Sequence, residues 1–201
     1  IANPDVKNIF IKRAKIISSI RDFLDNNDFI EVETPALQPI YGGASAKPFT
    51  TYHNSLDQTL YLRIADELYL KRLIIGGFEK VYEIAKNFRN EGMDKSHNPE
   101  FTSLEFYQAY SDVYLMMDFT EKMIKHVATE MDEVIFGYNG SEIDLSKAFN
   151  RKTMFELFEK HVGIDIAKMN LDNLKDLIKE KSIEVSDEYN YGQLLDKIFG
   201  E

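Results

Sequence analysis

The chain has 201 residues, of which 44% are hydrophobic and 29% charged, and its formal net charge is -10. This composition is typical of a folded globular protein and excludes a disordered or fibrous chain. The absence of cysteine excludes disulfides and thiolate metal sites, and the four scattered histidines lack the spacing of a zinc site. The first residues lack the layout of a signal peptide and no apolar run reaches membrane-spanning length, so we expect a cytoplasmic protein without a membrane partner.

Charge and proline are distributed unevenly along the chain. Residues 1–110 carry 13 basic and 15 acidic side chains, whereas residues 111–201 carry 11 and 19. All five prolines precede residue 100, which predicts a turn-rich first part and a mostly helical second part. The acidic balance opposes a general electrostatic attraction to nucleic acid. Because the chain begins with Ile and not with Met, we expect it to be a piece of a longer gene product.

The first elements in chain order are a long helix, a short strand and an extended loop. Apolar residues at helical spacing predict an amphipathic helix over residues 5–27. Alternation in FIEVET predicts a strand over residues 29–34 that stops at Pro35. The segment YGGASAKPF then belongs to a long loop, and its small residues suit a close approach of the backbone to a ligand.

A strand, a helix and a hairpin follow. TLYLRI predicts a strand, and ADELYLKRLIIGG predicts a helix that is closed by its two glycines. Residues 80–89 and 101–110 are rich in aromatic and β-branched residues and predict an antiparallel hairpin with a large polar loop. Because side chains alternate along a strand, one face of the returning strand carries Phe101, Ser103, Glu105 and Tyr107. A carboxylate on a strand built for burial needs a partner, and we expect Arg89 to be the partner of Glu105.

The second part of the chain has helical periodicity and no constellation that suggests chemistry. Residues 112–135 predict a helix with a Met-rich apolar stripe, which we interpret as core. Asn139-Gly140 is typical of a hairpin turn, and Thr153 with Glu156 predicts a capping box at the start of another helix. Two more short helices are expected after it.

Polar residues gather at the loop of the predicted hairpin and on its returning strand. One interpretation is a structural ion network, because such networks are common. The other is a binding site, since a guanidinium, two carboxylates, an imidazole and an aromatic ring can hold an anion, an ammonium group and a planar ring together. The residues concerned are Arg89, Glu91, His97, Asn98, Phe101, Glu105 and Tyr107.

Three segments decide between these interpretations by resemblance: FIEVETPALQPIYGGASAKPF, YLRIADELYLKRL and NFRNEGMDKSHNPEFTSLEFYQAY. They resemble the class II lysyl-tRNA synthetases and cover the first two motifs of that class. The resemblance implies an α+β fold, an antiparallel β-sheet flanked by helices, that ends before the third class motif. It makes residues 1–110 the catalytic core and residues 111–201 a mostly helical continuation of the same domain. The third motif and the anticodon-binding OB domain are not found, so we expect this chain alone to be inactive.

The resemblance also implies a reaction and its participants. These are ATP-dependent activation of L-lysine to lysyl-adenylate and transfer to the 3′ end of tRNA(Lys) by a homodimer. Arg89 matches the catalytic arginine that bridges the amino-acid carboxylate and the α-phosphate. The implied ATP contacts are Arg89, Asn90, Glu91, His97, Asn98 and Phe101. The implied lysine contacts are Gly43, Glu67, Arg89, Glu105 and Tyr107. Magnesium is implied for the full-length protein, with no ligands in this chain. Asp66 departs from the family, which usually has proline there.

Two alternatives stay open. A paralogue that attaches lysine-like amino acids to elongation factor P lacks an anticodon domain, although the GGASAKPF and RIADELYLKR segments fit the synthetase better. A catalytically inactive module that senses or binds lysine is the alternative from another functional class.

Overall fold

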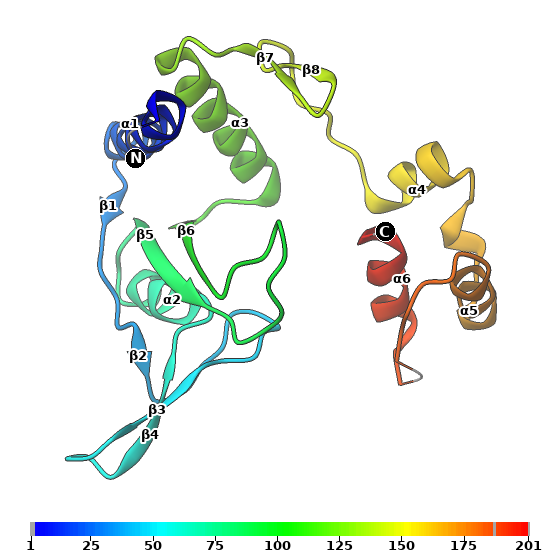
Figure 1. Cartoon of the computed structure of the whole chain (residues 1–201), viewed down its shortest axis with the longest axis horizontal. Coiled ribbons are helices and arrows are strands. Elements are labelled where there is room, and N and C mark those ends of the chain that lie inside the picture. Colours follow the sequence, from blue (N-terminus) through cyan, green and yellow to red (C-terminus); the bar gives the residue numbers. More distant parts are fainter. Residues whose placement is uncertain (1–2, 187, 201) are drawn as a thin grey trace. The chain divides into compact units, whose positions relative to one another are not determined.

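The structure is a computed structural model that describes residues 3–186 and 188–200 (Figure 1). It divides after residue 148 into two compact units, each with its own elements. Across the described ranges, no helix has both the length and the apolar character needed to cross a membrane.

The boundary between the units lies later than the change in sequence character at residue 110. Helix α3 (Val113–Glu130) follows that change, yet Phe119 and Met123 of α3 pack into a core cluster of the first unit. The apolar stripe of α3 is therefore core at these two residues, whereas Leu115 at its start is 53% exposed. That both parts belong to one catalytic domain stays a prediction.

The first unit begins with the predicted long helix, α1 (Pro4–Asp25). Asn3 caps it, because its side-chain oxygen accepts a hydrogen bond from the Asp5 N–H at 2.9 Å. Strand β1 follows but spans only Ile30–Glu31, much less than the predicted strand. It is short because Thr34 leaves the ladder and binds a side-chain carboxylate with both its N–H and its hydroxyl.

The predicted hairpin is confirmed. Strands β5 (Lys80–Phe88) and β6 (Glu100–Gln108) pair antiparallel over their whole length. Strand β1 joins the other edge of β5 in parallel, so the sheet β1-β5-β6 is mixed and not purely antiparallel. The parallel pair is possible because a long segment between β1 and β5 contains a helix that carries the chain back across the sheet.

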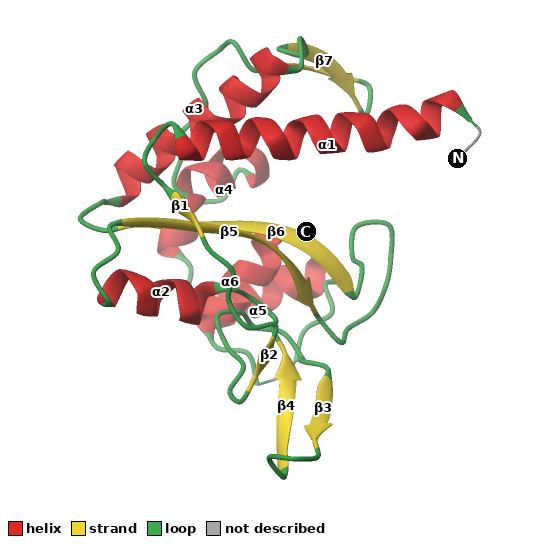
Figure 2. Cartoon of the chain, turned by 90° about the vertical axis from the view of Figure 1, so that its left-hand side faces the viewer, coloured by secondary structure: helices red, strands yellow, loops and turns green. Residues whose placement is uncertain are grey.

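Helices cover both faces of this sheet, with α1 on one side and α2 (Glu67–Ile75) on the other (Figure 2). The face under α1 and α3 is aromatic and aliphatic, and its core cluster is formed by Leu24, Phe29, Tyr82 and Met123. The face toward α2 carries polar side chains, among them Glu83 and Glu105, which pair with each other in the strand ladder. Helix α2 contacts both strands on this face. The hairpin thus separates an apolar layer from a polar one.

The first unit also contains a second sheet, with the strand order β2-β4-β3. It consists of β2 (Leu37–Gln38), β3 (Thr50–His53) and β4 (Gln58–Leu62), of which only β4 was expected. The sequence signals miss β3 because all four of its residues are exposed and show no apolar alternation. Strands β7 (Ile135–Tyr138) and β8 (Ser141–Asp144) form the predicted hairpin around Asn139-Gly140, both at positive φ.

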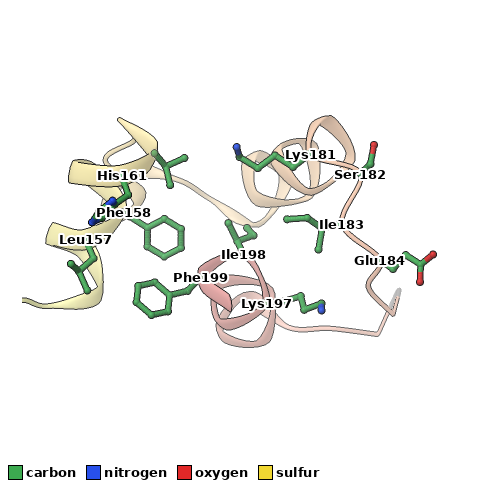
Figure 3. A pocket seen from close by; sticks show the side chains of 11 residues that line it. Leu157, Phe158, His161, Lys181, Ser182, Ile183, Glu184, Lys197, Ile198 and Phe199 are labelled. Carbon is green, nitrogen blue, oxygen red and sulfur yellow. The ribbon is translucent and has the colours of Figure 1, made fainter. Parts of the chain in front are cut away.

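In the described residues of the second unit, 149–186 and 188–200, there are three short helices and one 3-10 turn. They are α4 (Met154–Val162), η1 (Ile166–Lys168), α5 (Leu171–Glu180) and α6 (Tyr191–Gly200). The predicted capping box at Thr153 and Glu156 is confirmed at the start of α4. A cavity of about 1030 Å³ lies in this unit. Figure 3 shows Phe158 and Ile198 among the side chains that line it. None of the predicted site residues lines it.

Candidate functional site

The site lies on the face of β5 and β6 that is turned toward α2. Glu105 is at its centre, opposite Glu83 in the strand ladder. The Asp66 N–H donates a hydrogen bond to Glu105 Oε1 at 3.0 Å, and the Tyr107 hydroxyl donates to Glu105 Oε2 at 2.8 Å. Both carboxylate oxygens are thus oriented by the protein. Within the described residues, no ion pair gives Glu105 a cation.

The expected ion pair between Arg89 and Glu105 is wrong. Arg89 comes directly after Phe88, which pairs with Glu100 at the far end of the hairpin. Its guanidinium instead lies over the Phe101 ring, 5.1 Å from the ring centroid. Because Arg89 and Glu105 sit at different ends of the hairpin, the strand register keeps them apart.

Gly43 brings the small-residue loop against the first turn of α2. Its φ is +89°, and a Cβ placed there would lie 2.8 Å from the Glu67 Cβ and 3.1 Å from the Ala65 Cβ. Only glycine fits this position without displacing its neighbours. The structure therefore brings together Gly43 and Glu67, two of the residues that the resemblance assigns to lysine.

Glu67 and Tyr107 share one electrostatic environment. Burial, the hydrogen bond to Glu105 and the negative charges of Glu105, Glu67 and Asp66 together raise the pKa of Tyr107 above its ordinary value. The phenol therefore keeps its proton and acts as a donor to Glu105. Gly43, Glu67, Glu105 and Tyr107 converge on one acidic end of the site.

Lys71 already places an ammonium group at this acidic end. Its Nζ lies 2.6 Å from Glu67 Oε1, one helical turn away, and 6.0 Å from the centroid of the Tyr107 ring. The Lys71 side chain is 54% exposed, so a ligand can displace it from Glu67 at little cost. Counted together, four carboxylates exceed two cations here: Asp66, Glu67, Glu83 and Glu105 against Arg63 and Lys71.

A buried polar network supports the acidic end from below. Arg63 Nη1 lies 2.7 Å from Glu83 Oε1, and Arg63 Nε lies 3.3 Å from Asp66 Oδ1. Glu83 also accepts hydrogen bonds from the Thr34 N–H at 3.1 Å and the Thr34 hydroxyl at 2.6 Å. Asn87 Nδ2 donates to Asp66 Oδ2 at 3.3 Å. Arg63, Asp66, Glu83 and Asn87 are each at most 6% exposed, so this network is shielded from solvent.

Asp66 is the least well compensated member of this network. Burial raises its pKa to about 6, and the nearby carboxylates of Glu83 and Glu105 add to the rise while Arg63 opposes it. Its Oδ1 accepts no hydrogen bond from the described residues, because Arg63 Nε donates to the Lys86 carbonyl at 2.9 Å.

Arg89 and Phe101 form the opposite end of the site. The Arg89 N–H donates to the Pro99 carbonyl at 2.9 Å, which closes the loop between β5 and β6. Arg89 Nε is buried and has no hydrogen-bond acceptor among the described residues. A buried guanidinium N–H of this kind is costly unless an acceptor binds it, so the site has a donor available for an anionic ligand.

Asn90 and Glu91 hold the small-residue loop against the hairpin loop. The Asn90 N–H donates to the Lys47 carbonyl at 2.7 Å, and the Lys47 N–H donates to Glu91 Oε1 at 3.2 Å. Two segments far apart in sequence are thereby joined beside Arg89.

The tip of the hairpin loop is organised by Asp94. Its Oδ1 accepts hydrogen bonds from the N–H groups of Ser96 and His97, and its Oδ2 lies 2.8 Å from His97 Nδ1. The Ser96 N–H and the His97 side chain lower the pKa of Asp94. The His97 side chain is 73% exposed, and Asn98 Nδ2 donates to the Glu100 carbonyl at 2.9 Å. These two predicted residues lie on the loop, and no hydrogen bond among the described residues joins their side chains to Arg89.

The two ends are connected along one strand. Phe101 and Glu105 are four residues apart on β6, which corresponds to about 13 Å at an ordinary strand rise. Between them, Ser103 accepts a hydrogen bond from Asn87 Nδ2 at 2.5 Å. The arrangement can therefore bind an elongated ligand that carries a planar ring and an anion at one end and an ammonium group at the other.

Sequence reasoning missed the buried network. Glu83 and Asn87 are four residues apart on β5, so they lie on the same face of that strand. In the strand ladder they pair with Glu105 and Phe101, which lie on the site face of β6. Alternation along β5 could therefore have placed both on the site face. Nothing in the sequence indicates Thr34, because its contact depends on where β1 ends. For metals, the ranges 3–186 and 188–200 contain no group of three acidic or histidine side chains that could hold an ion.

Comparison with known proteins gives consistent matches over the chain. The family model described as tRNA synthetases class II (D, K and N) matches residues 1–186. The Lysine--tRNA ligase of Clostridium novyi is 50% identical over 206 residues, which cover 100% of this chain and 40% of that protein. Those of Thermoanaerobacter pseudethanolicus and Mycoplasma mobile are 49% and 48% identical, and the aligned regions cover 41% of each. The chain thus spans about two fifths of the length of these relatives.

Proposed function

The chain belongs to the class II tRNA synthetases of the D, K and N family, and from this we propose that it forms the substrate-binding part of a lysine--tRNA ligase. Such an enzyme activates L-lysine with ATP and transfers it to the 3′ end of tRNA(Lys). The relatives in Clostridium and Thermoanaerobacter support this choice. The observation that carries the choice of lysine is Glu105, a carboxylate oriented by the Asp66 N–H and the Tyr107 hydroxyl and given no cation by the described residues.

Lysine fits the acidic end by charge. Its ε-ammonium binds Glu105 and the Tyr107 oxygen, and its α-ammonium binds Glu67 after displacing Lys71. An ammonium group that leaves water needs such partners, because an uncompensated buried charge is strongly unfavourable. Once Lys71 is displaced, the four carboxylates at this end outnumber the one remaining cation, Arg63, and favour a ligand with two ammonium groups. Gly43 lets the loop backbone approach the substrate closely.

Arg89 serves the chemical step. An oxygen of the lysine carboxylate attacks the α-phosphorus of ATP, the bond to the bridging oxygen breaks, and pyrophosphate leaves. Two anions must approach each other, so a fixed positive charge between them lowers the barrier. Arg89 is held over Phe101, and its buried Nε–H has no acceptor among the residues that the structure describes; these features support this role. A hydroxyl of the tRNA then attacks the carbonyl carbon of the adenylate and releases AMP.

ATP occupies the Arg89 end of the site. Adenine stacks on the face of the Phe101 ring that Arg89 does not cover, and the polar loop residues bind the triphosphate and the base. These residues are Asn90, Glu91, His97 and Asn98. Magnesium, which the family implies, finds no ligand cluster in the described part of the chain, so no step is assigned to it.

We further propose a cytoplasmic homodimer. The first turns of α1 support the homodimer, because Ile9 and Phe10 are 65% and 61% exposed. A groove of about 440 Å³ between α1 and β6 adds apolar surface next to them. Apolar surface of this kind marks interaction sites between proteins.

The test is amino-acid-dependent ATP/pyrophosphate exchange by the product of the complete gene, with lysine, β-lysine, asparagine and aspartate as substrates. We expect exchange with L-lysine, and its loss by at least about 100-fold in Arg89→Ala, the order found when a charge-stabilising donor is removed. Arg72→Ala, which removes an arginine on the exposed side of α2, is the matched control and should leave exchange unchanged.

Other outcomes would redirect the assignment. A preference for β-lysine would favour the ligase that modifies elongation factor P. Absence of exchange with every amino acid in a folded protein would contradict an enzyme and leave a lysine-binding module.

A further inference from the structure

Asp66 touches the acidic end of the site from beneath and is itself inaccessible to a ligand. It is 0% exposed, and it lies directly before the first residue of α2. Its main-chain N–H and its side-chain carboxylate contact different groups. The N–H donates to Glu105 Oε1, whereas the carboxylate points into the buried network, where Arg63 and Asn87 contact it.

Charged and titratable groups face the Asp66 carboxylate from each element packed around it. Arg63 comes from the segment after β4, Glu83 from β5, and Glu105 and Tyr107 from β6. Glu67 follows it in α2. Arg63 is closer to Glu83 than to Asp66, at 2.7 Å against 3.3 Å, and no donor in the described part of the chain gives Asp66 Oδ1 a hydrogen bond. The negative charge of Asp66 is therefore incompletely compensated within the described residues.

The incompletely compensated charge of Asp66 affects the binding of a charged ligand at Glu105. In a buried environment its field is weakly screened, so it attracts a cation bound at Glu105 over several ångströms. We propose that Asp66 is a positioning residue for the ammonium-binding end of the site: its N–H fixes the Glu105 carboxylate, and its own carboxylate strengthens the binding of an ammonium ligand. This inference rests on the proposed function, in which that ligand is lysine.

The proposal makes lysine affinity depend on pH through a residue that does not touch lysine. Because burial raises the pKa of Asp66 to about 6, the carboxylate gains most of its charge between pH values of about 5 and 7. Lysine binding should therefore strengthen over the same interval. If Asp66 had a purely structural role, its substitution would change the affinity for lysine by the same factor at every pH.

The experiment measures the dissociation constant of lysine for the complete gene product, without ATP, at several pH values from about 5 to about 7.5, by calorimetry. Asp66→Asn keeps the N–H and the side-chain shape and removes the charge. Asp22→Asn, on the exposed side of α1, changes the net charge equally and is the matched control. We expect Asp66→Asn to weaken lysine binding about fivefold at the upper pH, the order expected for one buried charge. At the lower pH the two proteins should agree within about twofold, because the wild-type carboxylate is then protonated.

The outcomes are distinguishable. A wild-type to variant ratio that is the same at every pH, or equal affinities throughout, would overturn the role of Asp66 while leaving lysine binding in place. Absence of lysine binding by the wild-type protein at every pH would overturn the proposed function together with this inference. If Asp66→Asn does not fold, the wild-type profile decides: lysine affinity must fall about fivefold toward the lower pH, because protonation removes the same charge as the substitution.

Discussion

Glu105 and Arg89 lie on the same hairpin, yet their surroundings differ in burial and in partners. Beneath Glu105, Arg63, Asp66 and Glu83 are 6%, 0% and 3% exposed and bind one another. In the hairpin loop that follows Arg89, the side chains of Asp94 and His97 are 62% and 73% exposed, and among the described residues their hydrogen bonds stay within that loop. The acidic end is therefore part of the buried structure, whereas the hairpin loop between β5 and β6 lies on the surface.

This difference separates stability from function. A change in the buried network under the acidic end disturbs a desolvated set of charges, so it should affect folding as well as ligand binding. In the exposed hairpin loop, water can replace the contacts that a substitution removes, so such a change should affect ligand binding alone. Substitutions at the two ends test this separation, from the largest expected effect to the smallest.

The largest effect is expected for Arg63→Met. Removing the guanidinium leaves Glu83 and Asp66 buried without their cation, and loss of one partner of a buried pair costs about 3–5 kcal/mol. The free energy of unfolding, measured by urea denaturation, should fall by this amount. Arg72→Met, on the exposed side of α2, should change it by less than about 0.5 kcal/mol. Equal effects of the two substitutions would contradict the importance of the network.

The pH dependence of stability tests the Asp66 environment next. The pKa of Asp66 is about 6 in the folded protein and has an ordinary value of 3.8. Below the ordinary pKa the group is protonated in both states, and its raised folded pKa costs nothing. As the pH rises from about 4 to about 6, the unfolded chain releases its proton first, so Asp66 lowers the stability of the folded state by up to about 3 kcal/mol.

Asp66→Asn removes this titration. The free energy of unfolding of the variant, relative to wild type, should therefore rise between pH values of about 4 and 7 by about 3 kcal/mol. Thermal or urea unfolding at a series of pH values measures it. A difference that does not change with pH would contradict the buried, proton-retaining carboxylate.

Tyr107→Phe should affect binding more than folding. It removes the hydroxyl that donates to Glu105 Oε2 at 2.8 Å. We expect the KM for lysine to rise about tenfold, the order for a hydrogen bond to a charged group, with the KM for ATP unchanged. Tyr110→Phe is the control, because that side chain is 98% exposed. An equal rise in the KM values for lysine and ATP would contradict a specific role of Tyr107 in binding lysine at the acidic end.

The smallest effect is expected in the loop. His97→Ala should raise the KM for ATP about fivefold, because it removes one exposed polar side chain that is proposed to bind ATP. It should change the free energy of unfolding by less than about 0.5 kcal/mol. His53→Ala, another exposed histidine, should change neither quantity. A large loss of stability in His97→Ala would show that the loop is not independent of the buried structure.

The elements that sequence reasoning predicts well have strong local signals. The hairpin follows from β-branched and aromatic runs, and the start of α4 follows from Thr153 and Glu156. Strand β3 lacks such a signal because it is exposed along its length. The short span of β1 depends on Thr34 binding a carboxylate 49 residues later in the chain. Contacts of that separation are visible only in three dimensions.

The candidate site divides in the same way. Alternation along β6 correctly places Phe101, Glu105 and Tyr107 on one face. The expected partner of Glu105 was wrong, because which residues face each other depends on the strand register. That register pairs Glu105 with Glu83 and leaves Arg89 over Phe101. The roles of these residues toward lysine and ATP stay predictions.

Discrimination between lysine and norleucine tests the central claim most directly, because norleucine lacks only the ε-ammonium that Glu105 is proposed to bind. The measurement is the ratio of kcat/KM for the two amino acids in ATP/pyrophosphate exchange by the complete gene product. Glu105→Gln should reduce the preference for lysine by about 100-fold, the order expected when one partner of a desolvated charge pair is lost. His97→Ala should leave the preference unchanged. An equal loss of activity with both amino acids in Glu105→Gln would contradict an ammonium site at Glu105.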